Sequence, residues 1–105
     1  MKSSLKRPTH DELRRFYIIK FEIGCIVCEI FGNIYSPAYA HHILSGGNRI
    51  SHMATIPLCG YHHDDPAGIS IHGARVEFIE DYGTEMELLE ATNRRVKEFE
   101  GSVVG

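Results

Sequence analysis

Three cysteines and one histidine have the types and the spacing of ligands for a single metal ion. They form two pairs, Cys25 with Cys28 and Cys59 with His62, and two residues separate the members of each pair. This spacing lets two side chains reach one tetrahedral ion, and thiolate together with imidazole is a ligand set that Zn²⁺ prefers. We therefore expect a structural Zn²⁺ site that joins the segment around residue 25 to the segment around residue 59.

Other roles for these residues are open at this stage. The three thiols could pack as small apolar side chains, or Cys25 and Cys28 could form a disulfide that leaves Cys59 unpaired. The first residues are basic but lack the apolar stretch of a secretory signal, so we expect a cytoplasmic protein, in which thiols stay reduced and such spacing more often indicates a metal. His63 could replace His62 as the fourth ligand, but the matched CxxC and CxxH spacing favours His62.

Between the two pairs lies a doublet, His41 and His42, that the zinc site does not need. An imidazole has an ordinary pKa of about 6.5, so near neutral pH it can accept a proton from water or bind a divalent ion. Adjacent residues of a regular strand point to opposite faces. We therefore expect the two histidines to have different roles.

Length and charge limit the remaining possibilities. A chain of 105 residues allows one small domain, in which a structural metal adds useful stability. The sequence contains no run of 18 apolar residues, so it does not predict a membrane-spanning helix. The net charge is −3, but six of the 11 Lys and Arg residues lie within residues 1–20. We expect a basic arm and helix over residues 1–22, a main domain over 23–100 and a tail over 101–105; a merely solvated basic face is the alternative.

The first third of the chain predicts a helix followed by a turn. Thr9 and Glu12 form a capping box that begins the helix, and Gly24 can end it. Residues 29–35 are expected to form a turn through Gly32. The apolar residues of the helix recur at helical spacing and predict its buried face: Leu13, Phe16, Tyr17 and Phe21.

The middle of the chain predicts two extended segments. Residues 38–44 are expected to form a strand that carries the doublet, residues 45–48 a loop, and residues 54–58 a second extended segment. A short helix or tight turn is expected from His62 onward.

The last third predicts two helices. Residues 76–82 place apolar side chains on one helical face, although the alternation at their start also suits a strand, and Gly83 ends the element. A capping box of Thr84 and Glu87 begins a last helix that is expected to reach Gly101. Its shared face consists of Leu88, Leu89, Thr92, Val96 and Phe99.

This order of elements resembles the HNH, or ββα-metal, endonucleases whose core holds a zinc knuckle. Within that superfamily the chain is similar to the phage recombination-enhancement, RecA-dependent nucleases, and the likeness covers residues 25 to about 90. The motifs that carry it are His41-His42-Ile43, Arg49-Ile50-Ser51-His52, Thr55 to His63, Ser70-Ile71-His72-Gly73 and Tyr82-Gly83. The resemblance implies an α+β fold, with a small zinc-stapled ββα-metal (His-Me finger) core flanked by N- and C-terminal helices.

The resemblance also implies roles for single residues. His42 falls on the general base, and His41 and His63 fall on ligands of a catalytic divalent ion, with His72 as a further, helix-borne ligand. Many relatives have Asp where this chain has His41, which leaves Mg²⁺, Mn²⁺ or Zn²⁺ open as the catalytic ion.

Two neighbouring residues have less definite roles. Arg49 could contact a phosphate of the substrate or be a solvated loop residue. His52 could brace the site through a hydrogen bond or lie on the surface.

The implied function is endonucleolytic hydrolysis of DNA in phage recombination, leaving a 5′-phosphate and a 3′-hydroxyl. Its partners would be DNA and a RecA filament, in the cytoplasm of a bacterial host that carries the phage or prophage. One alternative is a non-catalytic zinc module that binds DNA or a recombination protein, and another is an RNase. The histidines that the zinc does not need favour an enzyme.

Overall fold

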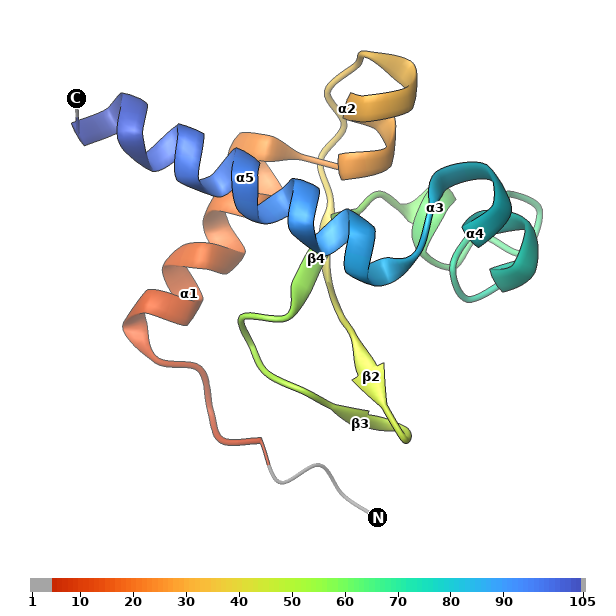
Figure 1. Ribbon diagram of the computed structural model, residues 1–105, viewed down its shortest axis with the longest axis horizontal. Helices are drawn as coiled ribbons and strands as arrows, with labels where there is room; N and C mark the ends of the chain where they lie inside the picture. Colours follow the sequence, from red (N-terminus) through yellow and green to blue (C-terminus); the bar gives the residue numbers. More distant parts are fainter. Residues whose placement is uncertain (1–4, 105) are drawn as a thin grey trace.

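The computed structural model describes residues 5–104, so the expected basic arm is described only from Leu5 onward, and its Lys2 lies outside the described residues. The chain forms a small α+β structure with two short two-stranded sheets (Figure 1). Its elements are, in order, α1 (His10–Tyr17), the π-helix η1 (Ile18–Ile23), α2 (Ile26–Gly32), β1 (Tyr39–His42), β2 (Leu44–Ser45), β3 (Asn48–Arg49), β4 (Thr55–Leu58), α3 (Gly60–His63), α4 (Arg75–Tyr82) and α5 (Glu85–Val104).

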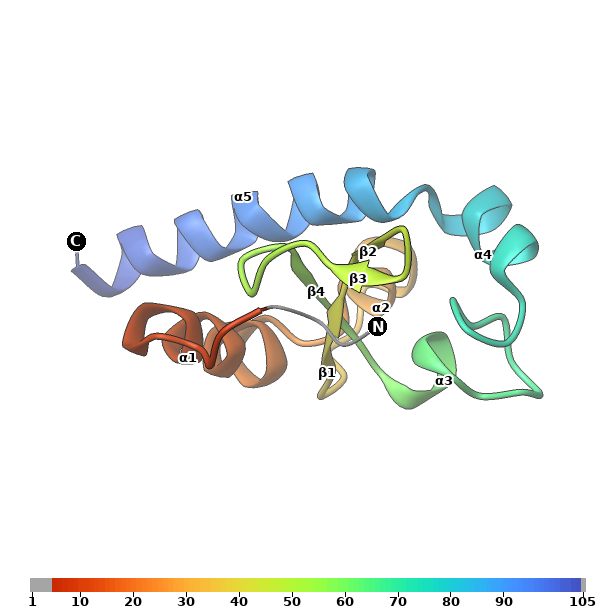
Figure 2. The same cartoon turned by 90° about the horizontal axis from the view of Figure 1, so that it is seen from below.

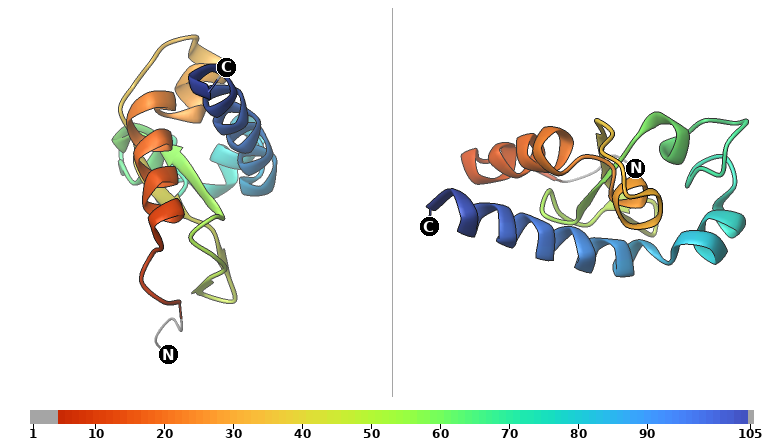
Figure 3. Two further views of the ribbon diagram at one scale, coloured as in Figure 1. Left: turned by 90° about the vertical axis from the view of Figure 1, so that its left-hand side faces the viewer. Right: turned by 90° about the horizontal axis from the view of Figure 1, so that it is seen from above.

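Strands β1 and β4 form the central antiparallel pair, in which His41 lies opposite Ile56 and His42 lies opposite Thr55. All four residues of β4 are buried, because η1, α2 and α5 pack against this strand. The left view of Figure 3 shows β4 between α1 and α5, and Figure 2 shows α5 running along one side of the molecule. Strand β4, which pairs with the strand that carries His41 and His42, is therefore packed against helices from both ends of the chain.

Helix α1 begins at the predicted capping box: Glu12 N donates to Thr9 Oγ1 at 3.2 Å, and Thr9 N donates to Glu12 Oε1 at 2.8 Å. The predicted buried face is wrong, since three of its four residues are exposed: Leu13, Tyr17 and Phe21. The buried residues are instead Arg15, Ile18 and Ile19. The first residue of this buried face is polar, so a search for apolar spacing does not find it. The π-helix η1 that follows also has more residues per turn than the α-helix that the prediction assumed.

Arg15 explains why the helix turns this face inward. Its Nε donates to Thr55 Oγ1 at 2.9 Å, its Nη2 donates to the Thr55 carbonyl at 2.6 Å, and its Nη1 donates to Asn93 Oδ1 at 2.8 Å. Burial lowers the pKa of Arg15, and these bonds replace the water that the guanidinium loses. One side chain thus links α1, β4 and α5.

The predicted turn over residues 29–35 is wrong in its first half. Residues 26–32 form helix α2, with Cys25 as its N-cap and the Cys28 amide 3.5 Å from the Cys25 sulfur. The turn after Gly32 is present, because Asn33 takes the left-handed conformation with φ 53°. A helix of seven residues gives too short a pattern to recognise, and a cysteine is an unusual cap.

The C-terminal half is helical as expected, with corrections at the boundaries. Residues 75–82 form helix α4 and not a strand, and Gly83 ends it with φ 103°. Helix α5 begins directly after Thr84, the N-cap of the predicted capping box, but continues through Gly101 to Val104, whereas its end was expected at Gly101. Helix α3 begins at Gly60, two residues before the expected start at His62. None of the described helices has the length and apolar character that crossing a membrane requires.

Gly24 is the glycine on which the approach to the first cysteine pair depends. Its φ is +76°, and a Cβ placed there would lie 2.6 Å from the Ser36 carbonyl oxygen. We predict that Gly24→Ala lowers the free energy of unfolding by about 1–3 kcal/mol, because it adds both a clash and a left-handed alanine. Gly101→Ala is the control: it lies in α5 with open space around it and should add about 0.5–1 kcal/mol. Urea denaturation measures both, and equal effects would contradict the prediction.

Candidate active site

The two ligand pairs meet at the N-termini of two helices. Cys25 caps α2 and Cys28 lies in its first turn, while Cys59 caps α3 and His62 lies within it. The four ligand atoms lie within 4.8 Å of one another. The Cys28 and Cys59 sulfurs are 3.7 Å apart, and His62 Nδ1 lies 3.3 Å from the Cys59 sulfur and 3.6 Å from the other two. Ligands about 2.0–2.3 Å from a tetrahedral zinc have separations of this size. The cluster can hold a metal ion such as zinc.

Without a cation, the electrostatics of this cluster favour neutral thiols. Burial raises the pKa of Cys25, and burial together with the neighbouring thiols raises the pKa of Cys28 to about 12. Burial also lowers the pKa of His62, which leaves its imidazole neutral with a lone pair to donate. Thiolates in such a place are stable only beside a positive charge, and a metal ion provides one. All three cysteines are free, so the Cys25–Cys28 disulfide alternative does not describe this structure.

A second cluster contains three histidines: His41 from β1, His63 from α3, and His72 from the turn before α4. Their candidate ligand atoms also lie within 4.8 Å of one another. Two backbone bonds fix the turn against α3, since Ile71 N donates to the His62 carbonyl at 2.9 Å and His72 N donates to the His63 carbonyl at 3.0 Å. The structure therefore places His63 in this cluster and not with the cysteines. His72 lies in a turn, so its expected position on a helix is wrong.

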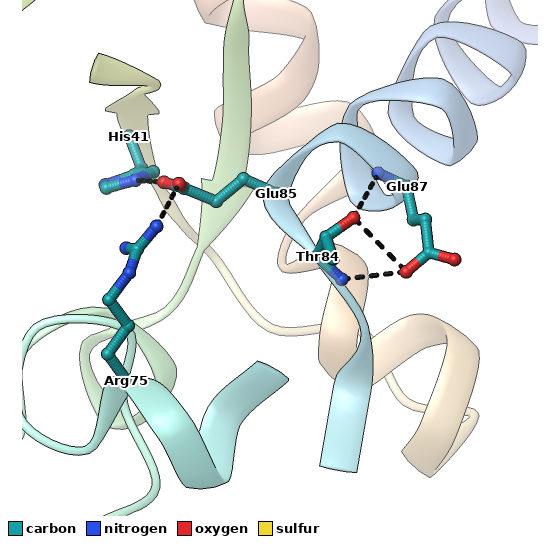
Figure 4. A network of polar contacts seen from close by, with 5 residues as sticks. All are labelled: His41, Arg75, Thr84, Glu85 and Glu87. Carbon is teal, nitrogen blue, oxygen red and sulfur yellow. Dashed lines mark hydrogen bonds and ion pairs between the residues drawn. The ribbon is translucent and has the colours of Figure 1, made fainter. Parts of the chain in front are cut away.

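Glu85 forms a hydrogen bond with His41, and the sequence analysis did not predict a role for Glu85. His41 Nε2 and Glu85 Oε2 are 2.6 Å apart, and Arg75 Nη2 donates to Glu85 Oε1 at 2.9 Å (Figure 4). The hydrogen bond from His41 and the pairing with Arg75 keep the pKa of Glu85 below its ordinary value, although burial opposes this shift. Glu85 lies at the start of α5, between Thr84 and Glu87 of the capping box. The sequence pattern at these positions was interpreted only as the start of a helix.

The bond to Glu85 determines which nitrogen of His41 is available. An ionised carboxylate only accepts hydrogen bonds, so Nε2 of His41 carries the proton. A neutral imidazole then keeps its lone pair on Nδ1, which is the atom left to bind an ion. Carboxylates commonly orient metal-binding histidines in this way.

His42 lies beside the second cluster but outside it. It lines a pocket of about 390 Å³ together with Arg49 and the three histidines of that cluster. Burial, and then the charge of Arg49, lowers the pKa of His42 to about 4. His42 is consequently neutral near pH 7, with a lone pair on one ring nitrogen, and its lowered pKa makes it a weaker base than an ordinary histidine.

His52 and Arg49 are neighbours of His42. His52 is buried, 6% exposed, and its Nδ1 lies 3.0 Å from His42 Nε2, so His52 is no surface residue. Arg49 is exposed at the end of β3, in the hairpin that turns through Gly46 and Gly47. A guanidinium at the edge of such a pocket can contact an anion.

The two adjacent histidines of α3 give a direct test of the clusters. We predict that His62→Ala removes zinc and destabilises the protein, because a closed four-ligand site contributes to folding. His63→Ala is the matched control and should keep about one zinc per chain with little change in thermal stability. Metal analysis and thermal melts of both purified variants measure this. Zinc loss in the His63 variant, with zinc retained in the His62 variant, would reverse the assignment.

Comparison with known proteins places the chain in a family. None of the curated proteins matches it. The family model described as recombination enhancement, RecA-dependent nuclease matches residues 8–97, which include both clusters, His42 and His52. The name of this family describes a nuclease that depends on RecA. The chain belongs to the recombination enhancement, RecA-dependent nuclease family.

Proposed function

We propose that this protein is a metal-dependent HNH endonuclease that hydrolyses DNA phosphodiester bonds. The observation that carries the proposal is the pocket in which a neutral histidine, His42, lies beside a three-histidine cluster and the guanidinium of Arg49. The antiparallel strands β1 and β4, followed directly by α3, have the order of a ββα-metal core, and this order supports the HNH assignment.

The residues of the pocket match the requirements of phosphodiester hydrolysis. Water must lose a proton near neutral pH, and His42 is the neutral base that can take it. The charge that develops on the phosphate must be stabilised, which the guanidinium of Arg49 can do from the edge of the pocket. A divalent ion held by His41, His63 and His72 would supply the Lewis acid for the phosphate and the leaving oxygen.

The two clusters differ in the number of metal coordination positions that they leave free. Cys25, Cys28, Cys59 and His62 provide four protein ligands, which completes a tetrahedral site and suits a structural Zn²⁺. The three imidazoles provide fewer ligands and leave positions for water and substrate. Three imidazoles suit Zn²⁺, and of the two ions that usually take oxygen ligands Mn²⁺ accepts nitrogen ligands more readily than Mg²⁺. We therefore propose Mn²⁺ or Mg²⁺ as the catalytic ion, with the stronger activity in Mn²⁺.

RecA-coated DNA is the substrate form that the family name suggests. The exposed basic residues of the arm and of α1 are the proposed contacts to the DNA backbone, in a bacterial cytoplasm that contains the phage or prophage gene. Arg15 of α1 is not among them, because it is buried and bonded to Thr55 and Asn93. A non-catalytic zinc module would need the cysteine cluster alone. The second cluster and the neutral His42 favour an enzyme over that module. A cleavage assay on single-stranded, duplex and RecA-coated DNA, and on RNA, with each metal, tests the substrate.

Removal of the proposed base gives the sharpest test of the mechanism. We predict that His42→Ala lowers the cleavage rate by about 10² to 10⁴-fold, the usual effect of losing a positioned general base. The variant should still fold, keep its zinc and bind DNA. His10→Ala is the control, because His10 is exposed at the start of α1 and does not line the pocket. A His42→Ala protein that cleaves at the wild-type rate would favour the non-catalytic module.

Glu85 allows the catalytic ion to be tested apart from the base. We predict that Glu85→Gln raises the Mn²⁺ concentration needed for half-maximal cleavage by about 10- to 100-fold, because His41 loses the carboxylate that orients it. Zinc content should not change. Glu87→Gln is the matched control: its side chain caps α5, and Gln also serves in a capping box. An unchanged Mn²⁺ midpoint in Glu85→Gln would contradict the role of Glu85.

A further inference from the structure

Behind His42, on the side of Nε2, two hydrogen bonds run in series. His42 Nε2 lies 3.0 Å from His52 Nδ1, and His52 Nε2 lies 2.6 Å from the carbonyl oxygen of Lys6. Phe16 packs edge-on against both rings, with centroid distances of 5.7 Å to His42 and 5.8 Å to His52. The segment before α1 is thereby connected to the pocket through a buried histidine.

The direction of both bonds follows from the acceptor at the end. A backbone carbonyl can only accept, so Nε2 of His52 carries a proton. In a neutral imidazole the other nitrogen then accepts, so Nδ1 of His52 receives the hydrogen of His42 Nε2. His42 is left with its lone pair on Nδ1.

We propose that His52 is a positioning residue that fixes the tautomer and ring orientation of His42, and that the Lys6 carbonyl completes this relay. The N-terminal segment is then part of the active site and not only a basic arm. The catalytic meaning of the relay rests on the proposed function of His42 as the base, whereas the tautomer itself does not.

The relay also has a chemical effect when His42 takes a proton. The proton from water goes to Nδ1 of His42, and the imidazolium that forms donates a stronger hydrogen bond from Nε2 to His52. A base whose second nitrogen is held by a third group recurs in nucleophile activation. Here the third group is the imidazole of His52, whose Nε2 hydrogen is bonded to a carbonyl of the chain.

Two substitutions of His52 separate positioning from packing. Gln can accept through Oε1 and donate through Nε2, whereas Phe fills the space of the ring without either bond. We expect His52→Phe to lower the cleavage rate by about 10- to 100-fold, as loss of an orienting partner does, and His52→Gln to restore most of that loss. His10→Gln, at an exposed histidine, is the control. Equal losses in His52→Phe and His52→Gln, with both proteins folded, would overturn the positioning role.

The tautomers of His42 and His52 can be measured without a cleavage assay. Two-bond ¹⁵N–¹H spectra of ¹⁵N-histidine-labelled protein distinguish a protonated ring nitrogen from an unprotonated one. We expect His42 and His52 each to carry the proton on Nε2 in the wild-type protein, and His42 to become a mixture of tautomers in His52→Phe. A proton on Nδ1 of His42 in the wild type, or an unchanged single tautomer in His52→Phe, would overturn the relay.

The contribution of Lys6 is that of its backbone and not of its charge. Lys6→Ala keeps the carbonyl and should leave both tautomers unchanged, whereas deletion of residues 1–6 should release the tautomer of His52. A tautomer of His52 that survives the deletion would overturn the part of the proposal that concerns the N-terminal segment. The proposed function is tested separately. If the wild-type protein shows the expected tautomers but the His42→Ala variant cleaves at the full rate, then His42 is not the general base, and the hydrogen-bonded relay still stands.

Discussion

The approach of the two ligand pairs, Cys25 with Cys28 and Cys59 with His62, is the constraint on which the rest of this structure depends, and it joins residues 31 positions apart along the chain. The cluster lies where the cap of α2 meets the cap of α3. The segment between these caps contains α2, β1, the β2–β3 hairpin and β4. A metal ion bound there would add a cross-link to a small core. The second cluster can form only because α3 is held in this place.

Each histidine doublet is divided between two tasks, by a different geometry in each case. In β1, His41 is buried toward Glu85 whereas His42 packs against Phe16 and His52. In α3, consecutive side chains are rotated by about 100° around the helix axis, so His62 faces the sulfurs while the next residue joins the other cluster. Local backbone geometry thus sorts four chemically identical side chains.

Sequence reasoning succeeded where the signal was local. The two ligand pairs, both capping boxes and the strand with the doublet could be predicted because short spacings determine them. The buried face of α1 could not, because it depends on bonds from Arg15 to Thr55, 40 residues away. Glu85 was missed for the same reason, since it meets His41 across 44 residues of chain. The metals, and the roles of single residues, remain predictions that the fold accommodates.

The adjacency of His62 and His63 in a helix of four residues limits how this segment can change. Substitution at Tyr61, which is exposed, leaves the angular positions of both histidines intact. Insertion or deletion of a single residue between Cys59 and His62 would rotate both histidines by one helical step relative to Cys59 and remove each from its cluster. Among related sequences, we therefore expect α3 to vary in composition and to be invariant in length.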